Sequence, residues 1–534
     1  MHRTACLSCL LALLGCEQAA PPVQEAPLPL PAHIGDGDTV ALRCGKTYHG
    51  TLDLRGRSKV TVTTAGACGK ATISPAAPVT GWTRYRGRIY VAPLAQAPAQ
   101  VAVDGVQVPR AHWPNRGWAR PDVAPLGGSM PAGELAGATL VWLDNQSVVK
   151  SAMLATNSIG TDKPYYVEGK LWMLDSAGEW AHAGGRLYLW SVDGRSPEGR
   201  AWAAPDADGI DADRSHDVVV DGVRIVAARR GISAEGAVAL SVLRTDIADT
   251  GGAGIWANGS RALRVAGSSV TNARTSGIDG WYDIRDATIV DTTVAGTGMG
   301  GQPTPTGAGI FFGDGAGNRI HKVRVRDSAY HGISVLHNRD TEVLDSVVDH
   351  ACARLTDCGG IYTGARDRQP LDLRIEGNTV VDVGGSEGTG IYLDDHANRV
   401  TVRRNVLRNN TRALMLHNAF DVLVAGNDFV ASTEAHLVFA QDDGAIRANR
   451  VTGNLFGASA GAWTYKLEAG PNLKDFARFD GNTYDAGNAR RFARTWDGRA
   501  HGLTHDFRAW QAWSGQDRDS RMLDGAGAAP RAAR

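Results

Sequence analysis

The chain has 534 residues, with 56 lysines and arginines balanced by 56 aspartates and glutamates. This balance excludes a general electrostatic attraction to nucleic acid or anionic membranes, although a local charged cleft remains compatible with it. The length allows a long hydrophobic core, and 65 glycines are typical of a turn-rich all-β protein.

The first 16 residues predict a lipoprotein signal peptide. A short basic start, Met1–Arg3, precedes an apolar run, Leu7–Leu14, that is too short to span a bilayer. The run ends in Leu-Leu-Gly-Cys, which resembles a bacterial lipobox and implies lipidation of Cys16. The alternative is an ordinary secretory signal with an incidental cysteine. We expect residues 17–32, rich in proline, to form an extended tether, and the protein to be lipid-anchored at the periplasmic face or surface of the bacterial outer membrane.

A Gly-Ile step returns every 23 residues through the middle of the chain. It occurs at Gly231, Gly254 and Gly277, and again at Gly309 and Gly332. A fixed period of this kind indicates stacked structural units. Twenty-three residues are too few for two helices but suit one coil of three short strands. The sequence therefore predicts an all-β parallel β-helix.

Asparagines recur at about the same spacing, just before an apolar residue, at Asn378, Asn405, Asn427 and Asn454. In a solenoid, such side chains can stack inside a turn and satisfy backbone groups that have no partner in a sheet. We interpret these asparagines as structural.

The repeat also divides the chain. We expect N-terminal β-helix coils over residues 33–110 and a small β-rich insertion over 111–200, where the period is lost. The main repeats should cover 201–456, followed by a capping region over 457–534 with a short amphipathic helix near Phe507–Trp513. A cap is expected because an open solenoid end exposes both core and strand edges.

The cysteines beyond the signal predict two disulfides. Cys44 and Cys68 are 24 residues apart, about one coil, and Cys352 and Cys358 flank a five-residue loop. Two bridges suit an oxidising compartment. We expect no metal at these cysteines, because no pair of histidines accompanies them at ligand spacing.

One face of the predicted coils gathers polar and aromatic side chains. Strand alternation places Ile391 and Leu393 in the core and Tyr392 and Asp394 outside. The equivalent outward positions on the other coils are Trp256, Asn258, Asp279, Trp281, Phe311, Ser334, Tyr362, Met415 and His417, and the strand ends add Asp283, Asp314, His337, Arg366, Asp367, Asp395, His396 and Asn418.

Rings that stack on sugars, with acids between them, are typical of carbohydrate binding. We therefore predict a groove for a polysaccharide along this face. The residues expected to bind substrate are Trp281, Asp314, His337, Tyr362, Arg366, Tyr392, His396 and His417.

Several segments resemble those of a known group of proteins. Residues 359–367 (GGIYTGARD) and 390–395 (GIYLDD) are similar to a motif pair in bacterial right-handed β-helix carbohydrate enzymes, and residues 414–418 follow one coil later, where those proteins often carry a histidine. Residues 178–190 resemble their insertion, and residues 510–517 their cap. The chain thus resembles pectate-lyase-like proteins, most nearly glycoside hydrolase family 141 and its relatives. The resemblance implies a right-handed parallel β-helix with its active site at the two motifs.

Hydrolysis of a glycosidic bond usually needs two carboxyl groups. Asp367 lies one coil before Asp394 and Asp395, so the groups should be about 5 Å apart before the side chains are added. We therefore predict catalytic roles for Asp367, Asp394 and Asp395, without a cofactor. The alternative is that the double aspartate only closes a turn.

Two other functions remain open from the sequence. A polysaccharide lyase or epimerase acting on uronates would use cations to stabilise its intermediate, and Asp314, Asp367, Asp394 and Asp395 could then hold Ca²⁺ with Arg366 as base. Lysine is scarce along the strip, which favours hydrolysis. The other alternative is a non-catalytic glycan-binding surface protein. In each case we expect a carbohydrate partner, no nucleic acid and a monomer.

Overall fold

The computed structural model describes residues 27–120, 134–144, 149–156, 159, 161–300, 307–459, 461–498 and 502–523. The expected signal peptide, most of the expected tether and Cys16 lie outside the described residues. Within these ranges, no helix combines the length and the apolar character that crossing a lipid bilayer requires.

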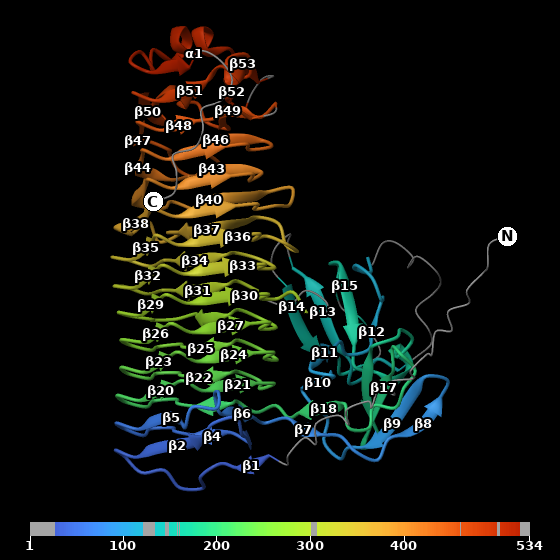
Figure 1. Cartoon of the computed structure of the whole chain (residues 1–534). Helices are drawn as coiled ribbons and strands as arrows, with labels where there is room; N and C mark the ends of the chain where they lie inside the picture. The colour runs from blue at the N-terminus through green and yellow to red at the C-terminus, as the bar shows by residue number, and fades with distance from the viewer. Residues whose placement is uncertain are drawn as a thin grey trace, which may run out of the picture.

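The protein is a right-handed parallel β-helix, as the repeat and the resemblance predicted. Three sheets run the length of the solenoid, and each strand pairs with the equivalent strand of the next coil (Figure 1). After each strand of sheet C up to β49, the chain passes through sheet B and then sheet A before it returns to sheet C one coil further on.

Among the described residues, sheet A contains 15 strands: β1 (Leu28–Pro29), β3 (Thr47–His49), β6 (Thr72–Ser74), β21 (Arg224–Val226), β24 (Asp246–Ala248), β27 (Ser269–Thr271), β30 (Thr293–Ala295), β33 (Arg324–Arg326), β36 (Val347–Asp349), β39 (Thr379–Val381), β42 (Val406–Arg408), β45 (Asp428–Val430), β48 (Leu455–Phe456), β51 (Thr483–Asp485) and β54 (Arg521–Leu523). Sheet B contains 13 strands: β2 (Thr39–Arg43), β5 (Thr61–Ala65), β20 (Val219–Asp221), β23 (Ser241–Leu243), β26 (Arg264–Ala266), β29 (Thr288–Val290), β32 (Arg319–His321), β35 (Glu342–Leu344), β38 (Leu373–Glu376), β41 (Asn398–Arg403), β44 (Phe420–Ala425), β47 (Asn449–Thr452) and β50 (Ala477–Asp480). Sheet C contains 14 strands: β4 (Leu52–Asp53), β19 (Ile210–Asp211), β22 (Ile232–Ser233), β25 (Ile255–Trp256), β28 (Ile278–Gly280), β31 (Ile310–Gly313), β34 (Ile333–Leu336), β37 (Cys358–Gly364), β40 (Gly388–Asp394), β43 (Arg412–His417), β46 (Ala435–Ala440), β49 (Trp463–Glu468), β52 (Ala493–Trp496) and β53 (Leu503–His505).

The glycine of each Gly-Ile step is required by the close approach of neighbouring coils. A Cβ atom at Gly277 would lie 2.6 Å from the carbonyl oxygen of Gly309, and one at Gly254 would lie 2.6 Å from that of Gly277. The same carbonyl of Gly277 accepts a hydrogen bond of 2.9 Å from the N–H of Ile255. A side chain at these positions would push the coils apart and break the ladder, which explains why glycine keeps the period.

The stacked asparagines are confirmed. The backbone N–H of Asn378, Asn405 and Asn427 each donates to the side-chain oxygen of the asparagine on the next coil, at 2.9 Å. The ladder continues through Asn454 to Asn482, which was not predicted. All five side chains are buried, so each amide satisfies backbone groups that water does not reach.

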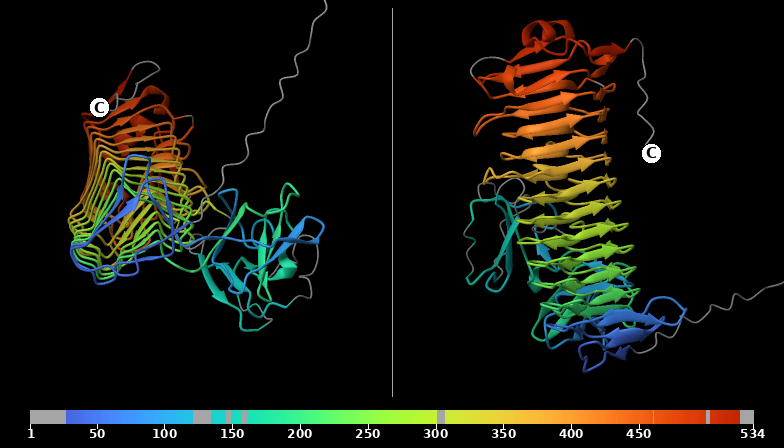
Figure 2. Two further views of the ribbon diagram at one scale, coloured as in Figure 1. Left: turned by 60° about the horizontal axis from the view of Figure 1, so that its bottom comes forward. Right: turned by 90° about the vertical axis from the view of Figure 1, so that its left-hand side faces the viewer.

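Antiparallel sheets built from residues 77–204 form a side domain next to the solenoid (Figures 1 and 2). Its strands are β7 (Ala77–Pro78), β8 (Thr83–Arg86), β9 (Ile89–Pro93), β10 (Gln100–Val103), β11 (Val106–Val108), β12 (His112–Trp113), β13 (Thr139–Leu143), β14 (Val149–Met153), β15 (Tyr165–Glu168), β16 (Trp180–Ala183), β17 (Arg186–Trp190) and β18 (Ala201–Ala204). The chain leaves the solenoid after β6 and returns at β19, so residues 77–110, expected to form coils, belong to this domain instead. Their alternating strands pair antiparallel with strands of the insertion, which the local pattern alone does not reveal.

The C-terminal end is closed by a helix, α1 (Phe507–Ser514), close to the position expected from the sequence. Asp506 caps its first turn by accepting a hydrogen bond of 2.7 Å from the N–H of Ala509. Trp510 is fully buried, and its ring lies 5.5 Å from those of Tyr465 and Phe479. The helix thereby covers the last coils of the core. Short 3-10 turns lie at Leu171–Met173, Leu473–Asp475 and Ala486–Asn488.

Both expected disulfides are present, Cys44–Cys68 and Cys352–Cys358. The first joins two adjacent coils just after β2 and β5, which pair in register from Thr39 to Arg43. The second closes the loop that precedes β37. This loop lies at one end of the site described next.

Candidate functional site

The outward positions of sheet C lie in one line, as the alternation predicted. The register pairs Trp256 with Asp279, Asp279 with Phe311, and Phe311 with Ser334. It continues from Ser334 to Tyr362, Tyr392 and Met415. We call this row of side chains the strip. Ile391 and Leu393, predicted to face inward, are fully buried in the core.

Most of the strip, however, does not face open solvent, contrary to our expectation. Phe311 and Tyr392 are each only 6% exposed. The reason is that neighbouring coils are about 4.8 Å apart, less than the width of a ring, so each ring covers the next. The rings of Tyr362 and Tyr392 lie 5.4 Å apart edge to face, and that of Trp281 lies 4.4 Å from that of Phe311. Access to the strip is therefore confined to its edges.

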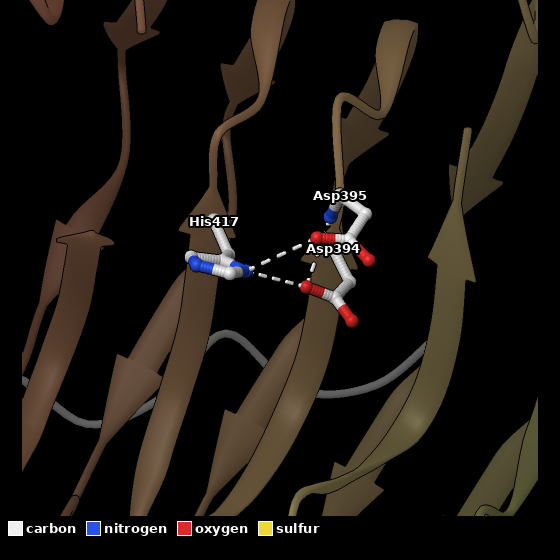
Figure 3. A group of neighbouring side chains, drawn as sticks. All are labelled: Asp394, Asp395 and His417. Carbon is white, nitrogen blue, oxygen red and sulfur yellow. Dashed lines mark hydrogen bonds and ion pairs between the residues drawn. The ribbon is translucent and has the colours of Figure 1, made fainter. Parts of the chain in front are cut away.

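At the carboxyl end of β40, next to the strip, the structure brings Asp394, Asp395 and His417 together (Figure 3). The His417 Nδ1 atom lies 2.6 Å from the Asp394 carboxylate and 3.7 Å from that of Asp395. The Tyr362 hydroxyl donates a hydrogen bond of 2.8 Å to the other oxygen of Asp394. The side chain of Asp394 is 11% exposed, whereas that of Asp395 is 26% exposed. Asp395 is therefore the more accessible carboxylate of the two.

These contacts fix the charges of the cluster. Burial acts to raise the pKa of Asp394, but hydrogen bonding and charge from His417, with the Tyr362 hydroxyl, outweigh it and hold this pKa below its usual range. Burial acts to lower the pKa of His417, but Asp394, then Asp442 and Asp395, outweigh burial and raise it. The second nitrogen of His417, Nε2, lies 3.1 Å from Asp442. Only the imidazolium can donate to carboxylates at both nitrogens, so the geometry favours a cationic His417.

Three further predicted residues extend the cluster along the same strand ends. The His337 Nδ1 atom lies 3.0 Å from Asp314, and its Nε2 atom accepts a hydrogen bond of 3.3 Å from the backbone N–H of Arg366. The Arg366 guanidinium in turn donates to Asp395 at 2.7 Å. Asp314, His337, Arg366, Asp395 and His417 thus form one row over successive coils.

Two predicted residues lie outside this row. The Asp367 carboxylate pairs with Arg339 on the preceding coil at 2.9 Å and accepts from the N–H of Gln369. Among the residues described, no hydrogen bond or ion pair joins it to Asp394 or Asp395, and its catalytic role stays a prediction. It closes a turn, as aspartates commonly do. His396 is buried and faces Asp443 at 3.1 Å rather than the cluster.

Trp281 lies further along the solenoid, four coil steps from Asp394 through β31, β34 and β37. At about 4.8 Å a step, the separation is roughly 19 Å. Its backbone N–H donates to the side chain of Asn258 at 2.6 Å, and the next residue, Tyr282, is 62% exposed. The two rings lie 6.5 Å apart and form an aromatic platform at this edge of the strip.

The cluster has a donor set that could hold a metal ion. One ligand atom from each of Asp394, Asp395 and His417 lies within 4.8 Å of the other two. Carboxylate oxygens suit Ca²⁺, and an imidazole nitrogen suits transition metals such as zinc or copper. The His417 nitrogen in this group already contacts Asp394, so a metal would have to displace that hydrogen bond.

Asp357, which was not among the predicted site residues, lies in the disulfide-closed loop just before β37. The residue is exposed, but partial burial of its carboxyl, followed by the charges of Asp394 and Glu387, raises the pKa of Asp357. Its position next to Cys358 could have indicated this residue from the sequence, because a disulfide holds the neighbouring residues in place.

Two family models match parts of the chain. Residues 203–348 match a model described as "Right handed beta helix region", and residues 307–467 match one described as "Periplasmic copper-binding protein (NosD)". Each covers less than half of the chain. A comparison with curated proteins found no match.

Solved structures are similar to the chain at low sequence identity. One described as "Glycoside hydrolase" has a TM-score of 0.52 and 14% identity, covering 77% of this chain and 89% of its own. "The complex structure of XylC with xylose" has a TM-score of 0.41 and 13% identity, and the match covers 88% of this chain and 82% of the XylC chain. A structure of the periplasmic alginate epimerase AlgG has a TM-score of 0.35 and 14% identity, and the match covers 57% of this chain and 69% of the epimerase chain. At these identities the likeness to the first structure shows the fold alone, and the predicted membership of family 141 stays a prediction.

Proposed function

We propose that this protein is a glycoside hydrolase that degrades a polysaccharide, with its reacting centre at Asp394, Asp395 and His417. The observation that carries the proposal is an ionised, buried Asp394 held by His417 and Tyr362 beside the more exposed Asp395. Such a cluster at the edge of an aromatic strip suits a sugar chain. The β-helix fold, shared with a structure described as a glycoside hydrolase, agrees with this function.

The three residues have different roles in this proposal. Asp394 accepts hydrogen bonds from three protein groups, namely His417, Tyr362 and the N–H of Asp395. Asp394 therefore orients the site, and Asp395 is the carboxylate that acts on the substrate. The cationic His417 and Arg366 stabilise this carboxylate and bind substrate hydroxyls.

The test compares Asp395→Asn with the wild type on a panel of polysaccharides, measuring new reducing ends. We expect a loss of about 10²–10⁴-fold in kcat, the usual effect of removing an acid or base. Asp421→Asn, the same substitution on the exposed face of β44, is the matched control and should leave activity unchanged. A wild type that releases no reducing ends from any member, or an Asp395→Asn variant with full activity, would refute the proposal.

Calcium-dependent elimination is the alternative, because Asp394, Asp395 and His417 could hold a cation. Such a lyase would produce unsaturated uronates, seen by ultraviolet absorbance, and EDTA would abolish the signal. Hydrolysis would instead give reducing ends without absorbance, in the presence or absence of EDTA. A non-catalytic glycan binder would give neither signal and would still retain the polysaccharide on a column.

We also propose that Cys16 carries a lipid and that the domain works in the periplasm or on the cell surface. Two disulfides suit an oxidising compartment, and one matching family model is described as periplasmic. Replacing Cys16 by serine should move the protein from the membrane fraction to the soluble exported fraction. Unchanged membrane association would contradict the anchor.

A further inference from the structure

A second tryptophan shares a row of outward positions with the cluster. In sheet C, the positions two residues after the strip form a parallel row, because alternation turns every second side chain outward. The strand pairings place in this row, in order, Trp281, Gly313, Leu336, Gly364, Asp394, His417, Ala440, Glu468 and Trp496. Trp281 and Trp496 are therefore each four coil steps from Asp394, on opposite sides of it.

The row between the two tryptophans can accommodate an extended chain. Eight steps of about 4.8 Å give a span of roughly 38 Å. Gly313 and Gly364 have no side chain and Ala440 has only a methyl group, so a bound chain can lie close to the backbone at these points. Charged groups lie beside the second half of the row, where the Lys466 ammonium is 3.2 Å from the Glu468 carboxylate.

Trp496 lines an open pocket at the C-terminal end of sheet C. The residue ends β52, next to the cap, and is 38% exposed (Figure 1). Leu503 of β53, the antiparallel partner of β52, is 58% exposed. Together with Trp513 of α1 and Lys474, they line a pocket of about 430 Å³. The Lys474 ammonium lies 4.9 Å from the centre of the Trp513 ring. Apolar and aromatic walls with a few polar groups are typical of a ligand site.

The position of the pocket favours a sugar as its occupant. Exposed aromatic residues also mark protein interfaces, but a protein partner would not require Trp496 to lie on the row of Asp394. A polysaccharide chain that follows this row from the Trp281 platform passes the cluster and then reaches Trp496. A tryptophan ring stacks on the apolar face of a pyranose, and the Lys474 ammonium can donate to its hydroxyls.

We propose that Trp496 is a second sugar-binding platform, and that one polysaccharide chain lies from Trp281 to Trp496 across Asp395. This inference rests on the hydrolase function proposed above and identifies its substrate as a long polysaccharide that is cut at internal bonds. A pyranose unit is about as long as one coil step, so the row holds about eight units. Units are then bound on both sides of the bond across which water adds, and both products are oligosaccharides.

The test replaces Trp496 by alanine and uses xylan, polygalacturonate and alginate as probes. Affinity electrophoresis measures binding, and steady-state kinetics measure cleavage of each polymer that yields reducing ends. For Trp496→Ala we expect Kd and KM to rise about two- to tenfold with kcat unchanged, because the ring is far from the reacting atoms. The KM of a trisaccharide from the same polymer should not change, because a trisaccharide bound across Asp395 cannot reach Trp496.

Three further measurements serve as controls. Trp496→Phe keeps a ring and should retain most of the affinity. Tyr85→Ala removes an exposed ring from β8 of the side domain, off the row, and should leave Kd and KM unchanged. The viscosity of the polymer should fall before many reducing ends appear, as internal cleavage requires.

Several outcomes would overturn the inference and leave the hydrolase function in place. These are an unchanged Kd and KM for Trp496→Ala, equal losses for the alanine and phenylalanine variants, and release of single sugars alone from the chain end. A wild-type dimer that Trp496→Ala dissociates, with sugar binding unchanged, would assign the surface to a second copy of the chain instead. Binding that depends on Trp496 without release of reducing ends would refute the hydrolase and keep the platform. A wild type that neither binds nor cleaves any of the three polymers would refute both.

Discussion

The His417 ring lies 2.6 Å from the Asp394 carboxylate, and this ion pair bridges two neighbouring coils, β40 and β43. The pKa of His417 is raised, so its share of the stability is present below the unfolded value near 6.5 and is lost as the pH rises through the folded pKa. The pKa of Asp394 is lowered, so its share is present above the unfolded value near 3.8 and is lost as the pH falls through the folded pKa. The pair therefore stabilises the fold most between these limits.

Replacing His417 by glutamine should lower the melting temperature most at about pH 5–6, between the two ordinary pKa values. The difference in melting temperature should become smaller in strong acid, where Asp394 is protonated, and in alkaline solution, where His417 is neutral. Breaking a largely buried pair costs about 3 kcal/mol. Thermal unfolding of both proteins across this pH range measures the difference. A difference that does not change with pH would contradict the charge assignment.

Replacing Trp281 by alanine should weaken the binding of long substrates without slowing the chemical step. The platform lies roughly 19 Å from Asp394, so only a polymer or long oligosaccharide reaches both. Loss of a stacked ring costs about 0.5–1.5 kcal/mol, which corresponds to about a two- to tenfold rise in KM. Steady-state kinetics on the polymer and on a short oligosaccharide test this point. An equal rise in KM for both lengths would mean that the platform acts through the fold.

Replacing Asn427 by alanine should destabilise the solenoid by about 1–3 kcal/mol, because the buried backbone N–H of Asn405 and carbonyl oxygen of Val402 lose their partner. Asn115→Ala, at an exposed position of the side domain, should change stability by less than about 0.5 kcal/mol. Chemical denaturation followed by circular dichroism compares the two. Similar effects for both variants would show that the ladder is dispensable.

Replacing Gly277 by alanine should cost about 1–3 kcal/mol by overpacking, since the new methyl group would lie 2.6 Å from the carbonyl oxygen of Gly309. Gly453→Ala is a useful comparison, because a Cβ there meets nothing within 4 Å, although its positive φ of 64° adds some strain. We expect the larger loss of melting temperature at Gly277. The reverse order would mean that the coils can separate at little cost.

The sequence predicted the features that repeat and missed those that depend on a single contact. The 23-residue period placed the strip in register, because each coil aligns with the next through the same Gly-Ile step. It could not predict that Asp367 pairs with Arg339, since both lie outside the regular strands. Nor could it place Asp357, whose position depends on a disulfide loop packed against a domain far away in the sequence.

The side domain interrupts the solenoid between β6 and β19, and this has a consequence for how the chain assembles. The strands β4, β5 and β6 pair on their outgoing side with β19, β20 and β21, more than 100 residues later in the chain. While the chain emerges from its amino end, three edges therefore remain open until residues 210–226 arrive. An open parallel edge invites pairing with other chains. The unpaired edges of β4, β5 and β6 are thus exposed to other chains during synthesis. The rate at which residues 77–204 fold sets how long this exposure lasts.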